Sequence, residues 1–371
     1  MKVPGVTSES IQYDIRLLFP VLILVGIGIV MVYSASSAMA LKKFGADSYF
    51  LKKQAMFALA GIVSLVTLRH IPYRFFRPLT YIILLLAVML LVSIKIPGIG
   101  YAAGGAERWI RFGGLSFQPS EFARFAMIIY LAYSLSKKQE KIDVLSIGFV
   151  PHVMVLLLFT ALILIQPDFG SVIILCALTW IMLFAGGVKI IHLLSGLIVV
   201  VPFAIYFMQT ADYRVKRILS FIDPWKHSSD TGYQVVHSLM AFGSGGVLGS
   251  GIGQGYQKLF YLPEPHTDFI FSVIGEELGL VGVLVILGLY GVIIWRGFSI
   301  SKRTKDLFGA FIALGLTTAL GLQVVINMGV TMGMLPPKGL ALPFLSYGGT
   351  SLLMNMACIG ILMNIGTSEA E

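Results

Sequence analysis

Charged residues are scarce in this 371-residue chain. Asp, Glu, Lys and Arg make up only 12% of it, whereas soluble proteins average near a quarter, and 57% of the residues are hydrophobic. The mean hydropathy of +0.88 is also far from soluble values. This composition excludes an ordinary soluble enzyme or binding module and indicates an integral membrane protein.

Cysteine is nearly absent, and histidine forms no cluster. Cys176 and Cys358 both fall in apolar runs and offer neither a disulfide framework nor metal-ligand spacing, so we assign them to packing. The six histidines match no H-E-x-x-H or comparable pattern. We therefore expect no dedicated transition-metal centre.

Long apolar runs are abundant, and each can cross a hydrocarbon core of about 30 Å as a helix. We predict an all-α integral membrane protein, a polytopic bundle of about ten transmembrane helices that forms a single domain over residues 1–371. The predicted spans are 16–34, 54–69, 79–96, 121–135, 147–165, 171–187, 189–208, 270–295, 307–328 and 347–365.

The balance of Lys and Arg predicts the orientation. An even number of spans puts both termini on one side, and the raw tally is a tie. Excluding the long 209–269 segment, because large loops translocate regardless of charge, places both termini in the cytoplasm. The long segments 97–120, 209–269 and 329–346 then share the outer face. The small residues of Ala38-Met39-Ala40 resemble a signal-peptide cleavage site, but the run before them is too long for one, so we expect it to be retained.

The first outer segment contains ERWIRFGGLSFQPSEFARF. Arg108 and Arg111 flank Trp109, and a spacing of three puts Glu121 and Arg124 on one helical face, where they can pair or present charges to a cavity. The alternatives are that Trp109 is an interfacial belt residue and that Arg124 extends to the membrane surface.

The second outer segment carries a basic cluster of Arg214, Lys216 and Arg217 beside aromatic residues. Such a cluster suits a phosphate, although a surface patch for anionic lipid is the slightly more common explanation. The glycines of GSGGVLGSGIGQG match no nucleotide-binding pattern and more simply allow close backbone approach and re-entrant turns.

Acidic residues gather in LPEPHTDFIFSVIGEELG, residues 262–279. Asp268 precedes an apolar run, so a helix N-cap is the simple alternative to a site residue. Glu264 suits a solvated turn, whereas Glu276 and Glu277 need a partner or a wet cavity, and we favour a structural role for them. Asp168 in QPDFGS is either a capping acid or a site residue.

The third outer segment, NMGVTMGMLPPKGLALPFLSYGGTS, is broken by Pro and Gly, and Lys338 is its only charge. Broken helices that face cavities occur in many transporters, so this feature suits transport as well as catalysis.

Taken in order, ERWIRFGGLSFQPSEF, QPDFGS, FIDPW, GYQ with SLMAFGSGG, LPEPHTDFIFSVIGEELG and PPKGLALPFLSYGGTS resemble the SEDS family of shape, elongation, division and sporulation proteins. The resemblance runs from about Gly26 to the last span. Two of the motifs, QPDFGS and PPKGLALPFLSYGGTS, are more similar to the division branch than to the elongation branch.

The resemblance implies a peptidoglycan glycosyltransferase that polymerises lipid II outside the cytoplasmic membrane and releases undecaprenyl pyrophosphate. It implies that Asp268 is the essential acid and that Trp109 and Glu121 belong to the functional region. Arg124 stands where family members commonly carry Lys, so electrostatic binding is retained there but proton shuttling is not expected.

The chemistry requires a base for the acceptor hydroxyl and positive charge near the leaving pyrophosphate. Asp268 suits the base. A divalent cation, Mg²⁺ or Mn²⁺, is an alternative source of the positive charge, although we identify no dedicated metal site. A lipid II flippase and a non-catalytic division scaffold remain alternative functions. The candidate cationic residues for the substrate are Arg111, Arg124, Arg214, Lys216, Arg217 and Lys338.

The resemblance also implies partners and a place in the cell. The chain has no soluble domain for transpeptidation, so we expect a class B penicillin-binding protein as partner, together with other membrane proteins of the division complex. The remaining ligands are lipid II and membrane lipids, and no nucleic acid is expected. The expected location is the cytoplasmic membrane at the division septum.

Overall fold

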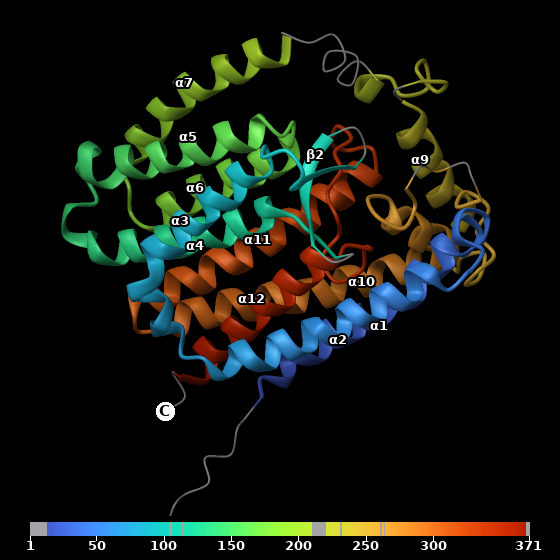
Figure 1. The fold of residues 1–371 in the computed structure, drawn as a ribbon, viewed down its shortest axis with the longest axis horizontal. Coiled ribbons are helices and arrows are strands. Elements are labelled where there is room, and N and C mark those ends of the chain that lie inside the picture. Colours follow the sequence, from blue (N-terminus) through green and yellow to red (C-terminus); the bar gives the residue numbers. More distant parts are fainter. Residues whose placement is uncertain are drawn as a thin grey trace, which may run out of the picture.

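A computed structural model of the protein describes residues 13–103, 106–112, 115–209, 220–230, 232–259, 262 and 264–368. Its architecture is a bundle of helices (Figure 1). Each predicted span is occupied by a helix, which confirms the predicted fold class. These helices are α1 Ile15–Phe44, α2 Tyr49–His70, α3 Phe76–Ser93, α4 Pro119–Lys137, α5 Val150–Leu164, α6 Phe169–Ala185, α7 Ile190–Gln209, α10 Ile270–Arg303, α11 Leu307–Thr331 and α12 Gly349–Ser368.

Seven helices of the described chain are long and apolar enough to cross a membrane, so the protein is a multi-pass membrane protein. The first and last helices of the bundle, α1 and α12, are connected through the end of α2. Tyr13, just before α1, packs its ring on Arg69 at the end of α2, with the guanidinium carbon 3.7 Å from the ring centroid. The carbonyl of Arg69 accepts a hydrogen bond of 2.7 Å from Asn364 near the end of α12. The start of α1 and the end of α12 therefore lie at the same end of the bundle.

The connections contain short elements. At the end of the bundle where α1 begins lie the turns η1 Tyr73–Phe75 and η2 Gln139–Lys141 and the π-helix η3 Leu145–Phe149. At the opposite end, helix α9 Tyr233–Gly245 lies within the second long segment (Figure 1).

The first long segment folds into a small antiparallel sheet that the all-α interpretation did not anticipate. Its strands are β1 Gly100–Ala103, β2 Ala106–Phe112 and β3 Leu115–Phe117, in the order β1-β2-β3. Tyr101 pairs with Trp109 and Ala102 with Glu107, so Arg108 is an extra residue in β2, a β-bulge.

Helix α10 is interrupted at Gly279. This residue has φ +64° and ψ −164°, a conformation that is essentially restricted to glycine. A Cβ at this position would lie 2.3 Å from the backbone nitrogen of Gly249, so the glycine-rich segment packs directly on the interruption. The predicted close backbone approach of these glycines is confirmed.

We expect Gly279→Ala to destabilise the protein by about 1–3 kcal/mol or more, because it combines backbone strain with a steric clash. Gly288→Ala in the same helix is the matched control, since its Cβ would meet nothing within 4 Å. The control should be neutral or stabilising by up to about 1 kcal/mol. Melting temperatures of the purified proteins measure the difference, and equal values for the two variants would contradict this account of the interruption.

Candidate functional site

Asp268 lies immediately before α10 but does not cap it. The N-cap residue of α10 is Phe269, and no side-chain capping hydrogen bond is present. Within the described chain the Asp268 carboxylate accepts no hydrogen bond. It lies instead against Gly339 of the third outer segment, where a Cβ would be 3.0 Å from Asp268 Oδ2. The capping interpretation of Asp268 is therefore wrong.

The backbone around Asp268 is joined to the segment before α12. Ser346 Oγ donates to the Thr267 carbonyl at 2.6 Å, and the Tyr347 amide donates to the His266 carbonyl at 2.8 Å. The two motifs thus form one structural unit, although they are far apart in the sequence.

Asn327 on α11 completes this unit. Its Nδ2 donates to the carbonyl of Asp268 at 3.0 Å and to the carbonyl of Leu340 at 2.6 Å. The Asn327 side chain therefore holds both the backbone of Asp268 and the segment against which the Asp268 carboxylate lies.

Aromatic rings close one side of the unit. The buried His266 ring lies 4.5 Å from the Phe50 ring and 5.6 Å from the Tyr347 ring, measured between centroids. Desolvation, together with the nearby Lys43, lowers the pKa of His266 to about 4, so this imidazole is neutral at physiological pH. Glu264 is exposed, as expected for a solvated turn.

Burial raises the pKa of Asp268 to about 7. The negative charges of Glu264 and Asp168 add to this rise, whereas the positive charge of Arg108 opposes it. A carboxylate with a pKa near the working pH is suited to general-base chemistry, because it is available both to accept a proton and to release it.

Arg108, whose charge acts on Asp268, is a candidate site residue that our sequence interpretation missed. The bulge in β2 turns its side chain toward the connection between α5 and α6, where Nε donates to the Gln166 carbonyl at 3.3 Å and a terminal nitrogen donates to the Pro167 carbonyl. Arg111, which we had placed at the substrate, is exposed and lies over the Tyr101 ring at 5.0 Å. Trp109 is half-buried in the same strand.

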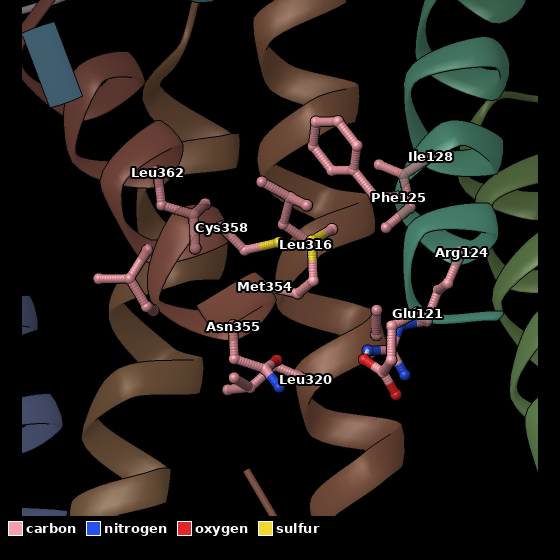
Figure 2. Close-up of a pocket in the computed structure, with 12 residues that line it drawn as sticks. Glu121, Arg124, Phe125, Ile128, Leu316, Leu320, Met354, Asn355, Cys358 and Leu362 are labelled. Carbon is pink, nitrogen blue, oxygen red and sulfur yellow. Dashed lines mark hydrogen bonds and ion pairs between the residues drawn. The ribbon is translucent and has the colours of Figure 1, made fainter. Parts of the chain in front are cut away.

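Glu121 and Arg124 form the predicted ion pair on α4, and both side chains are largely buried, 7% and 12% exposed. Arg124 therefore does not extend to the surface. Gln323 on α11 also donates to Glu121, at 3.4 Å. The pair borders a cavity of about 20 Å³ between α4, α11 and α12, enough for one water molecule (Figure 2). The other walls are mainly apolar and include Phe125, Leu316, Met354 and Cys358.

Asp168 is a capping acid. Its carboxylate accepts from the Ser171 amide at 3.2 Å as the N-cap of α6. It also accepts from the Ser171 hydroxyl at 2.7 Å, from Gln118 Nε2 at 3.2 Å and from Ser120 Oγ at 3.3 Å. These bonds tie the starts of α4 and α6 together, so the structural alternative for Asp168 is the one observed.

Lys338 is half-buried next to Gly339, and within the described chain no carboxylate lies within salt-bridge distance of its ammonium group. Desolvation lowers its pKa. It therefore adds an unpaired positive charge to the unit that holds Asp268. The predicted basic cluster of Arg214, Lys216 and Arg217 lies outside the described residues and stays a prediction.

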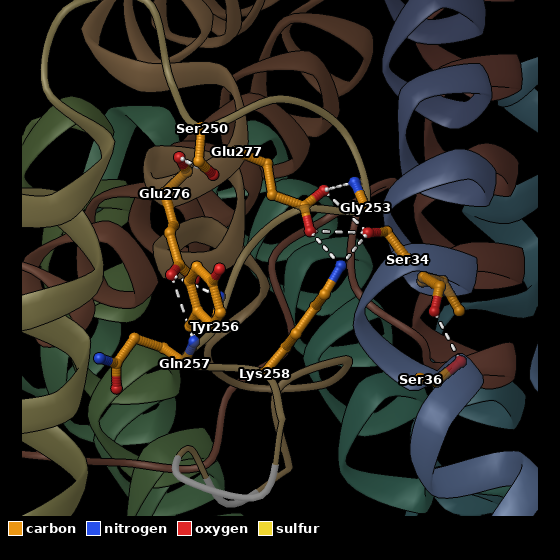
Figure 3. A network of polar contacts seen from close by, with 10 residues as sticks. Ser34, Ser36, Ser250, Gly253, Tyr256, Gln257, Lys258, Glu276 and Glu277 are labelled. Atoms are coloured by element: carbon orange, nitrogen blue, oxygen red, sulfur yellow. Dashed lines mark hydrogen bonds and ion pairs between the residues drawn. The ribbon is translucent and has the colours of Figure 1, made fainter.

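Glu276 and Glu277 have the partners that burial requires. Glu277 pairs with Lys258 at 2.5 Å, and Glu276 accepts from the Tyr256 amide at 2.7 Å (Figure 3). Among the described residues no group of three or more His, Cys, Asp and Glu side chains could hold a metal ion. The divalent cation therefore stays a prediction without an assigned site.

Comparison with known proteins identifies the family. A model of the FtsW/RodA/SpoVE family, described as cell cycle proteins, matches residues 15–371. The chain belongs to this family. A probable peptidoglycan glycosyltransferase FtsW of Geobacter metallireducens is 47% identical over 97% of the chain and 96% of its own length. The stage V sporulation protein E of Bacillus subtilis is 40% identical over 97% of the chain and 96% of its own length.

Solved structures agree with the family assignment. A chain from a structure titled "Structural coordination of polymerization and crosslinking by a peptidoglycan synthase complex" has a TM-score of 0.82 at 29% identity, over 97% of this chain and 99% of that one. The rod shape determining protein RodA of Thermus thermophilus has a TM-score of 0.71 at 28% identity, over 98% and 99%. The predicted resemblance, including its division branch, is confirmed by these relatives.

The raised pKa of Asp268 predicts how its replacement changes stability. Between about pH 4 and 7 the folded chain keeps a proton that the unfolded chain has released, so stability falls as the pH rises through this window. Asp268→Asn removes this loss. We expect the variant to melt at a higher temperature than the parent at pH 8 and to lose that advantage toward pH 4. A lower melting temperature at pH 8 would show that the carboxylate stabilises the fold.

Proposed function

We propose that this protein is a peptidoglycan glycosyltransferase that polymerises lipid II into glycan strands during cell division and releases undecaprenyl pyrophosphate. The family and the names of its relatives support the activity. The observation that carries the assignment to a site is Asp268, a carboxylate without a hydrogen bond in the described chain, whose pKa burial raises to about 7. It lies in the unit that also contains Lys338, for which the described residues offer no carboxylate at salt-bridge distance.

The reaction can be written around these groups. Asp268 takes the proton of the acceptor hydroxyl, and the resulting oxygen attacks the anomeric carbon of the donor sugar. The bond from that carbon to the pyrophosphate oxygen breaks, and the pyrophosphate leaves on its lipid. A single displacement inverts the anomeric centre, so an α-linked donor gives a β-linked strand.

Positive charge is needed where the pyrophosphate leaves. Arg108, from the sheet, and Lys338, beside the Gly339 against which Asp268 lies, are the candidates that supply it. We keep Arg111, Arg124, Arg214, Lys216 and Arg217 as substrate-binding candidates, with Trp109 and Glu121 beside them. A bound Mg²⁺ or Mn²⁺ would add Lewis-acid stabilisation of the same charge.

The proposed function includes the side of the membrane that the site faces and the protein that crosslinks its product. With both termini in the cytoplasm, the end of the bundle that carries Asp268 faces outside, where lipid II is polymerised at the septum. The synthase complex to which the chain is similar coordinates polymerisation with crosslinking. We propose a class B penicillin-binding protein as the crosslinking partner, in company with other division-complex membrane proteins.

Asp268→Asn tests the catalytic assignment, because an amide cannot take the proton of the hydroxyl. We expect a folded, membrane-inserted variant that makes little polymer from lipid II with Mg²⁺ or Mn²⁺ and the partner present. In the parent, turnover should fall as the pH drops through about 7, where Asp268 becomes protonated.

The outcomes separate the alternatives. Polymerisation by Asp268→Asn at the parent rate across the pH range would remove Asp268 from the chemistry. A parent that moves lipid II between leaflets but makes no polymer would be a flippase. A parent that does neither, with its partner present, would be a scaffold.

Arg108→Gln should lower turnover by about tenfold to a thousandfold, as expected for the loss of one group that stabilises developing negative charge. Arg111→Gln is the comparison variant in the same strand. Arg111 is also a binding candidate, but its guanidinium lies over Tyr101 on the exposed surface, so we expect a smaller loss of turnover than for Arg108→Gln. Initial rates over a series of lipid II concentrations provide the comparison. Equal losses in the two variants would indicate general electrostatic attraction and not a specific role for Arg108.

A further inference from the structure

At its interruption, α10 lacks two of its internal hydrogen bonds. The loop Ser250–Lys258 supplies new donors for the two carbonyls that are left free. In a regular helix the amides of Leu280 and Val281 would donate to the carbonyls of Glu276 and Glu277. Here they donate to Gly246 and Val247, at 3.0 and 3.2 Å. The two freed carbonyls of α10 accept instead from Ser250, at 2.9 Å, and from Gly251, at 3.0 Å.

The two glutamate side chains bind the same loop. Glu276 accepts from the amides of Tyr256 and Gln257. Glu277 accepts from the Gly253 amide at 3.0 Å and from Lys258 Nζ at 2.5 Å (Figure 3). The side chains of Lys258 and Glu277 are 6% and 0% exposed, so this is a buried ion pair, which requires accurate geometry to offset the loss of hydration.

Ser34 connects the ion pair to α1. Its hydroxyl lies 2.7 and 2.8 Å from the two carboxylate oxygens of Glu277, and Lys258 Nζ lies 2.8 Å from the same hydroxyl (Figure 3). The pair is therefore anchored to a helix that is distant in sequence.

The ion pair closes residues 258–277 into a ring, and Asp268 lies within that ring. The described side of the ring leads from Asp268 through the first turns of α10 to Glu277. The hydrogen bonds from Asn327 and Ser346 hold the ring next to Asp268, whereas the ion pair holds it at the far side.

We infer that Lys258 and Glu277 are positioning residues that hold the Asp268 segment in its working orientation, with Ser34 linking them to α1. This inference rests on the proposed function. A closed ring restricts the conformations open to the segment, and it keeps Asp268 against Gly339. Neither residue needs to touch substrate.

The experiment removes both charges together, because a single substitution would leave the other charge buried and alone. The variant is Lys258→Met with Glu277→Gln. The control is Asp14→Asn with Arg296→Met, which removes another largely buried ion pair, between the residue before α1 and α10. Ser34→Ala is a milder variant that leaves the ion pair in place.

At matched amounts of folded protein we expect the test variant to lose about tenfold to a hundredfold in turnover, with the KM for lipid II unchanged. Water admitted to the segment should also move the acid limb of its pH profile to lower pH. The control variant should have the turnover of the parent and the same acid limb in its pH profile. A structural role alone would change the folded fraction but would leave the pH profile in place.

Deuterium exchange gives a readout that does not depend on polymerisation. The amides of residues 266–269 should exchange faster in the test variant than in the parent or the control. Ser34→Ala should give a smaller increase in the same peptides, and it replaces the double variant if that variant does not fold. Unchanged exchange, or turnover and a pH limb equal to those of the parent, would overturn the inference. If the parent makes no polymer but the test variant still exchanges faster than the parent, only the proposed function is contradicted.

Discussion

Backbone that leaves a regular helix inside an apolar bundle must find new hydrogen-bond partners, and this constraint determines how the site is built. Water is scarce there, and each unpaired amide or carbonyl costs several kcal/mol. At Gly279 the partners come from the glycine-rich loop. Before α10 they come from Ser346, Tyr347 and Asn327. The motifs that carry chemistry are therefore also the segments that satisfy each other's backbone.

The same constraint sorts the acids. Asp168, Glu121, Glu276 and Glu277 each accept hydrogen bonds from named donors, so each has a structural use for its charge. In the described chain the Asp268 carboxylate accepts none, and desolvation raises its pKa. A group left without a partner in a well-satisfied environment destabilises the fold, which is the arrangement that an active site often retains.

Sequence could predict the helices because long apolar runs are a strong and local signal. It could not predict the partners of Glu277, since Ser34 comes from another helix and Lys258 lies beyond a turn. The capping interpretations of Asp168 and Asp268 both followed from the same local preference for Asp at helix starts. Only the tertiary contacts show that the first caps its helix and the second does not.

The small sheet shows why Arg108 was passed over. In the sequence, Arg108 and Arg111 flank one tryptophan and look equivalent. A bulge at Arg108 breaks the regular alternation of the strand, and a bulge is a long-range feature because it is defined by the register of the neighbouring strand. The two arginines have different contacts. Arg111 remains on an aromatic ring at the surface, whereas Arg108 is held by two carbonyls and contributes its charge to Asp268. A fixed guanidinium that lowers the pKa of a carboxylate is also suited to bind an anion, and this is why Arg108 is a candidate for the leaving pyrophosphate in the proposed reaction.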